Sequence, residues 1–376
     1  MPHNRPSKQF SNIDTQFMAH AHALANSVKG NTFPNPSVGA VLVKNGKIIG
    51  VGATAPYGGP HAEINAIEMA GDKAKGSTLY VSLEPCCHFG KTPPCTNAVI
   101  SAGITTVYAS SIDPNPLVRG KGMRILKKNG ITVYTGLLAN EADSINEDFF
   151  YWVKNKRPWV SVKLAMTLDG RIADSYGNSK WITSNASRTF VHDLRRRHAS
   201  IAIGRKTLVA DDPKLTVRHG FSAKPARIVF SSTPDLPRES YFVSSVKKQR
   251  APAPRSICVV RGGAKRSITV LQNGIELWRT GCKDAGAGLK AFLAMAYEEN
   301  ICSVFIEGGS RLASSFIEHD LVNRVYLFYG NKVLGNGIPG IHFKSLHRIE
   351  NALSLKNITM RQFDDDMMIT GLLKEK

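Results

Sequence analysis

Apolar residues in the first part of the chain recur at two different spacings, which predicts alternating helices and strands. From Ile13 they recur every three or four residues as far as Gly30, a typical helix stop, so we expect one helix there. Two short apolar runs flank Asn45-Gly46, a dipeptide typical of a tight β-hairpin. Further helices are expected over 61–70, 94–102 and 119–128, and strands over 79–83, 105–109 and 131–135. Such alternation indicates an α/β architecture with largely parallel strand pairing.

The alternation pauses and then starts again. One polar helix is expected around 141–151, and the charged segment 154–158 ends in a proline, which is typical of a domain boundary. Beyond it we expect strands over 159–165, 200–204, 226–230, 256–260, 301–307 and 324–329, and helices over 188–198, 285–299 and 312–319. We therefore expect two α/β domains, 1–155 and 156–376. The stretch 222–255, rich in Pro, Ser and Lys, carries no clear pattern.

The composition of the 376 residues is that of a globular protein. Hydrophobic residues make up 42% and charged residues 21%, which excludes the fibrous and wholly disordered classes. No apolar run approaches the roughly 18 to 20 residues that a membrane-spanning helix needs. The first 14 residues are polar and lack the apolar core of a secretion signal. We therefore expect a cytoplasmic protein without a membrane partner.

The chain is strongly basic, with a formal net charge of +20. Residues 1–155 hold 14 basic and 10 acidic residues, whereas 156–376 hold 35 and 19, so the excess lies mainly in the second half. The basic residues are scattered, apart from the run Arg195-Arg196-Arg197, and they do not alternate with aromatic residues as in grooves that bind single-stranded nucleic acid. Ordinary surface solubility or a small anionic ligand is therefore favoured, and an RNA-binding protein is the alternative.

One group of residues predicts a zinc site. His61 and Glu63 open one expected helix, while Cys86 and Cys95 each follow a proline at turns between a strand and a helix. One His and two Cys leave a fourth position open, which is typical of catalytic zinc. Glu63 lies near enough to move protons without being a ligand, as in nucleobase deaminases. A packed histidine and buried cysteines would be the plain alternative, but the ordered combination favours zinc.

Two residues between the zinc cysteines keep open roles. Cys87 is an alternative thiolate ligand, although it lacks the preceding proline that Cys86 and Cys95 share. His88 is either a substrate contact or an alternative ligand. The residue types alone do not decide between these roles.

At these motifs the chain resembles, over nearly its full length, the bifunctional riboflavin-biosynthesis deaminase–reductase family. The resemblance rests on Pro34-Asn35-Pro36-Ser37-Val38-Gly39, His61-Ala62-Glu63, the element from Glu84 to Cys95, Asp113-Pro114-Asn115-Pro116, Leu168-Asp169-Gly170-Arg171-Ile172-Ala173, Ser179-Lys180-Trp181-Ile182-Thr183, Asp211 to Arg218 and Glu307-Gly308-Gly309. Eight residues separate the two zinc cysteines, whereas tRNA and cytidine deaminases typically have two. Two positions depart from the family pattern, since Cys87 and Thr167 stand where Ser is usual.

The resemblance implies an α/β fold in both halves: an N-terminal cytidine-deaminase-like α/β/α domain and a C-terminal dihydrofolate-reductase-like α/β domain. The implied activity is zinc-dependent hydrolytic deamination of 2,5-diamino-6-(5-phosphoribosylamino)pyrimidin-4-one, followed by NADPH-dependent reduction of the ribosyl group to ribityl. The cofactors would be Zn²⁺ and NADPH. The partner would be this small phosphoribosyl-pyrimidine and not nucleic acid, and we expect a homo-oligomer.

The resemblance also implies roles for individual residues. The zinc ligands would be His61, Cys86 and Cys95. Glu63 would be the catalytic proton shuttle, and Asn35 would contact the pyrimidine. The cofactor would be bound by Ala165, Trp181, Thr207, Asp211 and Gly309. The phosphoribosyl substrate would be held by Ser179, Arg195, Leu215, Arg218 and Glu307.

The second half offers two further features of its own. Glu307-Gly308-Gly309 follows an apolar strand and precedes a helix, so its free N–H groups suit a phosphate. An ordinary strand-to-helix turn without a ligand would show the same sequence pattern. Lys163 alternates with apolar residues in an expected strand, and it points either to solvent or into a cleft.

Overall fold

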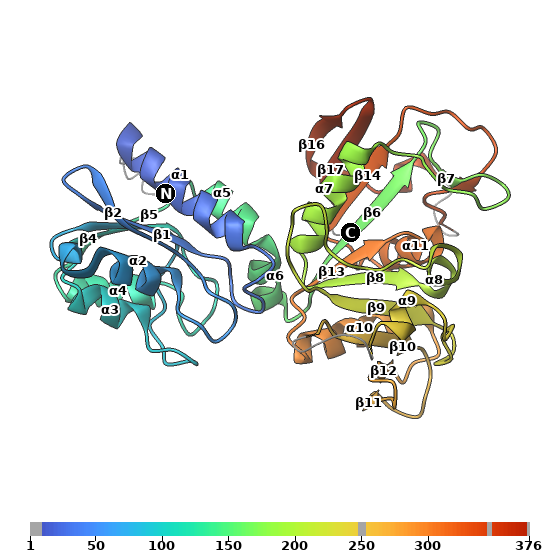
Figure 1. The fold of residues 1–376 in the computed structure, drawn as a ribbon, viewed down its shortest axis with the longest axis horizontal. Coiled ribbons are helices and arrows are strands. Elements are labelled where there is room, and N and C mark those ends of the chain that lie inside the picture. Colours follow the sequence, from blue (N-terminus) through green and yellow to red (C-terminus); the bar gives the residue numbers. More distant parts are fainter. Residues whose placement is uncertain (1–9, 247–252, 344–347, 374–376) are drawn as a thin grey trace. The chain divides into compact units, whose positions relative to one another are not determined.

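The computed structural model describes residues 10–246, 253–343 and 348–373, in two compact units, Met1–Asn155 and Lys156–Lys376. Each unit is described by itself (Figure 1). None of the described helices is long and apolar enough to cross a membrane.

The first unit is a five-stranded sheet covered by helices on both faces. Its strands are β1 (Gly39–Lys44), β2 (Lys47–Ala53), β3 (Thr78–Leu83), β4 (Thr106–Ser111) and β5 (Thr132–Thr135), in the order β2-β1-β3-β4-β5. Its helices are α1 (Asn12–Val28), α2 (Ala62–Ala70), α3 (Cys95–Ser101), α4 (Lys121–Lys128), α5 (Ala139–Ile145) and α6 (Glu147–Asn155), with a short 3-10 turn at Gly71–Ala74. β3, β4 and β5 pair in parallel, whereas β1 is antiparallel to both of its neighbours.

The alternation along β1 explains the layers of the first unit. Val41 and Val43 lie in a buried cluster with Met18 of α1, whereas Ala40 and Leu42 belong to the cluster that includes the buried alanines of α2. Successive side chains of a strand point to opposite faces, so β1 buries both of its faces. The α/β/α arrangement predicted for this half is confirmed.

The second unit is built on a ten-stranded sheet. Its strands are β6 (Trp159–Met166), β8 (Ser200–Gly204), β9 (Ala226–Ser231), β10 (Ser256–Val260), β11 (Ser267–Val270), β12 (Glu276–Arg279), β13 (Ser303–Glu307), β14 (Arg324–Tyr329), β16 (Leu355–Phe363) and β17 (Asp366–Leu373), in the order β11-β12-β10-β9-β8-β13-β6-β14-β17-β16. A two-stranded sheet pairs β7 (Arg171–Ala173) with β15 (Ile338–Pro339). The helices are α7 (Asn185–Arg196), α8 (Arg205–Asp211), α9 (Tyr241–Ser244), α10 (Ala285–Glu298) and α11 (Ser310–Glu318), and Ile349–Asn351 form a 3-10 turn.

The centre of this sheet is parallel and buried on both faces. β12, β10, β9, β8, β13, β6 and β14 pair in parallel, and antiparallel pairs occur with β11 at one edge and β17 and β16 at the other. Phe292 of α10 and Phe316 of α11 are fully buried against alternate residues of β6 and β13, in one cluster. Because parallel strands need helical crossovers, both faces are covered. The α/β class expected for the second half is confirmed.

The structure differs from the sequence expectations in particular elements. The single helix expected over 141–151 is two helices, α5 and α6, separated at Asn146. Short strands β7, β11, β12 and β15 and the hairpin of β16 and β17 were not expected from the sequence. In the stretch 222–255, β9 agrees with the strand expected over 226–230, α9 was not expected, and residues 247–252 lie outside the described residues.

Candidate active sites

The residues of the zinc motif converge because three strand ends lie at one edge of the first sheet. Gly39, the first residue of β1, pairs with the last residue of β2 and donates its N–H to Ser82 Oγ near the end of β3, at 3.1 Å. His61 follows β2 and precedes α2, Cys86 follows β3, and Cys95 is the first residue of α3. Segments far apart in the sequence therefore meet at this edge.

The structure brings the three predicted zinc ligands together. His61 Nδ1 lies 3.5 Å from Cys86 Sγ and 3.2 Å from Cys95 Sγ, and the three donor atoms lie within 4.8 Å of one another. One imidazole nitrogen and two sulfurs are a donor set that suits zinc, with a fourth position left for a water molecule or substrate. The residues present therefore fit a catalytic zinc ion.

Local bonding favours the thiolate form of Cys86, whereas the hydrogen bond to Cys86, followed by burial, raises the pKa of the Cys95 thiol. Hydrogen bonds from Cys95 and then from His61 outweigh burial and lower the pKa of the Cys86 thiol to about 4. The N–H of Cys95 also donates to Cys86 Sγ at 3.4 Å. Because zinc binds the deprotonated sulfur, this lowered pKa prepares Cys86 as a ligand.

Glu63 lies in the first turn of α2 and is buried beside the cysteines. Burial, followed by the negative charge of Cys86, raises the pKa of its carboxyl to about 7. A group whose pKa lies near the working pH both accepts and donates a proton readily. The position and pKa of Glu63 therefore suit proton transfer beside the three donor atoms.

The two residues with open roles lie apart from the donor cluster. Cys87 Sγ is 3.7 Å from the carbonyl oxygen of Leu117, and burial raises the pKa of its thiol. The cluster of donor atoms contains Cys86 and not Cys87. His88 Nδ1 is buried and has no hydrogen-bond partner among the described residues.

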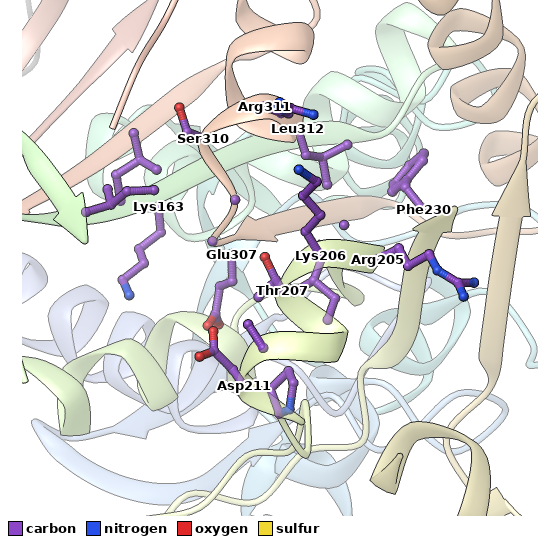
Figure 2. Close-up of a pocket in the computed structure, with 18 of the residues that line it drawn as sticks. Lys163, Arg205, Lys206, Thr207, Asp211, Phe230, Glu307, Ser310, Arg311 and Leu312 are labelled. Carbon is purple, nitrogen blue, oxygen red and sulfur yellow. The ribbon is translucent and has the colours of Figure 1, made fainter. Parts of the chain in front are cut away.

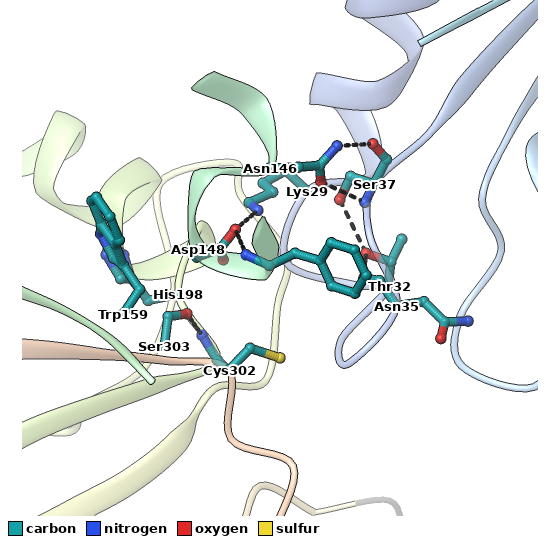
Figure 3. Close-up of polar contacts among 12 residues, drawn as sticks. Lys29, Thr32, Asn35, Ser37, Asn146, Asp148, Trp159, His198, Cys302 and Ser303 are labelled. Carbon is teal, nitrogen blue, oxygen red and sulfur yellow. Dashed lines mark hydrogen bonds and ion pairs between the residues drawn. The ribbon is translucent and has the colours of Figure 1, made fainter. Parts of the chain in front are cut away.

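Asn35 lies in the loop that precedes β1, at the same sheet edge as the zinc motif. Its carbonyl oxygen accepts a hydrogen bond from Thr32 Oγ1 at 3.0 Å, and Figure 3 shows its side chain directed away from the contacts that hold the loop. The amide of Asn35 is therefore free of that network and half-buried.

The second unit contains a cavity of about 1060 Å³ at the carboxyl ends of its parallel strands (Figure 2). Ligands of open α/β sheets bind at these strand ends. The cavity is lined by all of the predicted cofactor residues and by four of the predicted substrate residues: Ala165, Trp181, Thr207, Asp211, Gly309, Ser179, Arg195, Leu215 and Glu307. Arg218 does not line the cavity. It is exposed, three residues after Leu215 in the sequence, and its backbone N–H donates to His192 Nδ1 at 3.0 Å.

Three charged side chains, those of Arg195, Glu307 and Lys163, lie together in this cavity. Arg195 donates from Nε and Nη2 to the two carboxylate oxygens of Glu307, at 2.5 and 2.7 Å, and from Nη1 to the carbonyl oxygen of Thr216 at 3.0 Å. Burial alone would raise the pKa of Glu307, but the charge and hydrogen bonds of Arg195 outweigh it, so the pKa is lowered. Glu307 therefore stays ionised in the cavity.

Lys163, whose direction the sequence left open, lines the cavity near Glu307. Burial lowers the pKa of its ammonium group, and the charge of Glu307 partly opposes that effect. An amine with a lowered pKa exchanges protons more readily near neutral pH than an ordinary lysine does.

The glycine turn after β13 forms another wall of the cavity. Gly308 and Gly309 adopt φ of +71° and +79°, a region that glycine enters without steric cost, and Gly309 caps α11. The first N–H groups of that helix have no partner within the helix, so they suit a phosphate. The turn therefore fits the phosphates of a dinucleotide.

Among the basic residues of the cavity that sequence reasoning missed, three directly follow apolar strands. Arg205 and Lys206 follow β8, and Arg261 follows β10, two strands that only β9 separates, so all three line the same cavity. Arg205 donates to the carbonyl oxygen of Asp235. Their positions directly after apolar strands were the available signal, but the order of the strands was needed to bring them together.

Comparisons with known proteins agree with both units. A model of the RibD C-terminal domain matches residues 158–369, and a model of the cytidine and deoxycytidylate deaminase zinc-binding region matches 11–111. The riboflavin biosynthesis protein RibD of Aquifex aeolicus is 39% identical, with 95% of this chain and 98% of that protein covered, and the one of Escherichia coli is 34% identical, with 95% and 98% covered.

Solved structures give the same result. Acinetobacter baumannii RibD is 31% identical with a TM-score of 0.84, covering 96% of this chain and 99% of that one. A diaminohydroxyphosphoribosylaminopyrimidine deaminase/5-amino-6-(5-phosphoribosylamino)uracil reductase from Thermotoga maritima is 33% identical with a TM-score of 0.81, with the same coverage.

Proposed function

Because the chain belongs to the RibD family of bifunctional riboflavin-biosynthesis enzymes, we propose that residues 1–155 carry its deaminase activity and residues 156–376 its reductase activity. The enzyme deaminates 2,5-diamino-6-(5-phosphoribosylamino)pyrimidin-4-one by hydrolysis and then reduces the ribosyl group to ribityl, with Zn²⁺ and NADPH as cofactors. The assignment of residues to these steps is our proposal.

In the deaminase unit, His61, Cys86 and Cys95 hold zinc. The observation that carries this assignment is the convergence of their three donor atoms within 4.8 Å. Zinc, when bound, makes a water molecule more acidic and therefore a better nucleophile. Glu63 accepts a proton from the attacking water and donates it to the ring nitrogen, then carries the remaining hydroxyl proton to the departing amine, so that the ring gains a carbonyl oxygen and ammonia leaves. Asn35 binds the pyrimidine and fixes its position.

In the reductase unit, the cavity holds the cofactor and the ribosyl end of the substrate together. The glycine turn of Gly308 and Gly309 binds the cofactor's diphosphate, and Arg205, with Lys206 and Arg261, binds the phosphate that distinguishes NADPH from NADH. This proposal is supported by their place in one cavity, after the carboxyl ends of β8, β10 and β13. Four further residues expected to bind the cofactor complete that part of the cavity: Ala165, Trp181, Thr207 and Asp211.

The charged group of the reductase cavity acts on the sugar. NADPH supplies the hydride for C1′ of the opened ribosyl group. Lys163 donates the accompanying proton, and Glu307 and Arg195 hold the sugar hydroxyls and keep Lys163 in place. Ser179 and Leu215 line the substrate side, and Arg218, beyond the cavity wall, binds the substrate phosphate. The lowered pKa of Lys163 supports its role as the donor.

The finer properties of the enzyme complete the proposal. Its partner is a small phosphorylated molecule and not nucleic acid or a membrane, and it acts in the cytoplasm as a homo-oligomer. Titration with RNA at rising salt tests the alternative, because a protein that neutralises nucleic-acid phosphates loses affinity steeply as salt rises.

A product assay tests the division of labour. The diaminopyrimidinone ribosyl phosphate is supplied to zinc-loaded enzyme with and without NADPH, and the products are identified by mass. Without NADPH the deaminated ribosyl compound should accumulate, and with NADPH it should gain two hydrogens. In a Glu63→Gln variant, reduction of deaminated substrate should persist; if both activities disappear together, the assignment of one activity to each unit is wrong.

A further inference from the structure

Asn146 connects two distant parts of the first unit through its side-chain amide. It lies between α5 and α6, is 1% exposed, and binds the backbone of Ser37 with both of its polar atoms. The N–H of Ser37 donates to Asn146 Oδ1 at 2.9 Å, and Asn146 Nδ2 donates to the carbonyl oxygen of Ser37 at 2.9 Å (Figure 3). One side chain thus fixes the backbone of a residue 109 positions away.

Other buried polar contacts hold the same loop. At its start, Lys29 Nζ lies 2.6 Å from Asp148 Oδ1, and both side chains are buried. Within it, Thr32 Oγ1 donates to the carbonyl oxygen of Asn35 and lies 3.0 Å from Ser37 Oγ. Figure 3 shows that Asn146 and Asp148 approach the loop from the same side. Residues at the junction of α5 and α6 therefore hold the loop 29–37 at both ends, Asp148 at Lys29 and Asn146 at Ser37.

The position of Ser37 in the chain connects its hydrogen bonds with Asn146 to the zinc motif. Ser37 lies two residues before Gly39, whose N–H binds Ser82 at the end of β3, and β3 continues into Cys86. Asn35 lies two residues before Ser37, in the same loop. Fixing the backbone at Ser37 therefore fixes where Asn35 stands relative to the strand end that carries a zinc ligand.

From this geometry we propose that Asn146 is a positioning residue of the deaminase: by binding both backbone groups of Ser37, it holds Asn35 in place to bind the pyrimidine. The inference rests on the proposed role of Asn35. A buried amide with both polar atoms bonded to one peptide specifies a single loop conformation, because a shifted loop would leave buried polar groups unpaired.

The proposal distinguishes substrate positioning from plain stabilisation. The side chain of Asn146 contacts the loop and not the three donor atoms of the zinc motif. Its loss should therefore weaken substrate binding while the zinc ion stays bound. The reductase activity of the same chain, measured on deaminated substrate, reports whether the protein as a whole is intact.

The test is a double-mutant cycle with Asn35→Ala, Asn146→Ala and the double variant in the full-length, zinc-loaded enzyme. Asn146→Ala should raise the KM of deamination on the order of 10-fold, with a smaller change in kcat, about one zinc per chain and unchanged reductase activity. Because both residues act through one contact, the double variant should be no worse than Asn35→Ala alone. Asn155→Ala, which removes an amide from the far end of α6, should leave the deaminase unchanged.

Each outcome decides a different point. If Asn35→Ala deaminates normally, the proposed pyrimidine contact is wrong, and the positioning role falls with it. If Asn35→Ala is impaired but the two effects multiply in the double variant, the positioning role alone is wrong. If Asn146→Ala loses its zinc, Asn146→Asp decides: it keeps the acceptor for the N–H of Ser37, so a zinc-loaded Asn146→Asp with an unchanged KM would overturn the proposal.

Discussion

Replacing Glu307 with leucine should destabilise the reductase unit strongly, because it leaves two buried cations without their carboxylate. The Arg195–Glu307 pair is bidentate and almost fully buried, with side-chain exposures of 13% and 9%, and Lys163 also faces Glu307. Breaking a buried pair by removing one partner costs about 3 to 5 kcal/mol. For a unit of about 220 residues this corresponds to a fall in Tm of roughly 6 to 20 °C.

The three charges also predict an order among variants. Arg195→Met leaves Glu307 with the charge of Lys163 still beside it, so this variant should lose less stability than Glu307→Leu. The double variant Arg195→Met/Glu307→Leu should be more stable than Glu307→Leu alone, since an apolar pair of similar volume replaces the ion pair without an unpaired guanidinium.

Calorimetry of the full chain measures these shifts, with the exposed pair Arg266–Glu298 of the same unit as a control. These two side chains are 48% and 57% exposed, so Glu298→Leu should change stability by no more than about 1 kcal/mol. If Glu307→Leu melts within a degree of the parent, or if Arg195→Met is the less stable single variant, the description of Glu307 as the shared counter-ion is wrong.

Five further variants test the two sites. Cys86→Ser should lose zinc while Cys87→Ser keeps it, as metal analysis would show; the reverse result would exchange their roles. Glu63→Gln should keep zinc yet lose at least about 10²-fold in ammonia release, the low end for a positioned acid–base group. Burial lowers the pKa of Lys163, so a reductase that uses its ammonium as proton donor is fully active below that pKa and slows as the pH rises through it. Lys163→Arg keeps the positive charge but does not give up its proton, so reduction should fall by about 10²-fold or more, and near-normal activity of this variant would exclude Lys163 as the donor. Arg205→Ala should lower the preference for NADPH over NADH by about 10- to 150-fold in kcat/KM, the effect of one charge-assisted bond of about 1.5 to 3 kcal/mol, and an unchanged preference would exclude it from the phosphate site.

Local patterns predicted most of the elements but not those that depend on distant partners. The break between α5 and α6 occurs at Asn146, whose amide binds Ser37, 109 positions earlier in the chain. The residues next to Asn146 in the sequence do not indicate this contact, so the pattern over 141–151 predicted one polar helix. β16 is an edge strand with most of its residues exposed, so it lacks the alternation that identifies a half-buried strand.

The residues of the candidate sites also differ in whether local sequence patterns could predict them. The zinc motif could be found in the sequence because its residues sit next to prolines and helix starts within short segments. Lys163 could not be assigned, since the face of a strand that borders a cavity depends on which strands flank it. Here β13 and β14 flank β6, and the side chain of Lys163 lies beside Glu307 of β13.

The basic excess of the second half finds a physical explanation in its cavity. Among the described residues that line it, eight are basic and two are acidic: Lys163, Lys180, Arg188, Arg195, Arg205, Lys206, Arg261 and Arg311 against Asp211 and Glu307. One of the two carboxylates is already paired with Arg195. NADPH and a phosphoribosyl substrate together bring several phosphate charges into this space, and cations spread around a concave site meet that need better than a surface stripe would. A protein evolved to bind an extended nucleic acid would instead carry its charge along an exposed groove. The cavity therefore accounts for part of the basic excess of the second half, and the two small phosphorylated ligands that we propose for it would meet these charges.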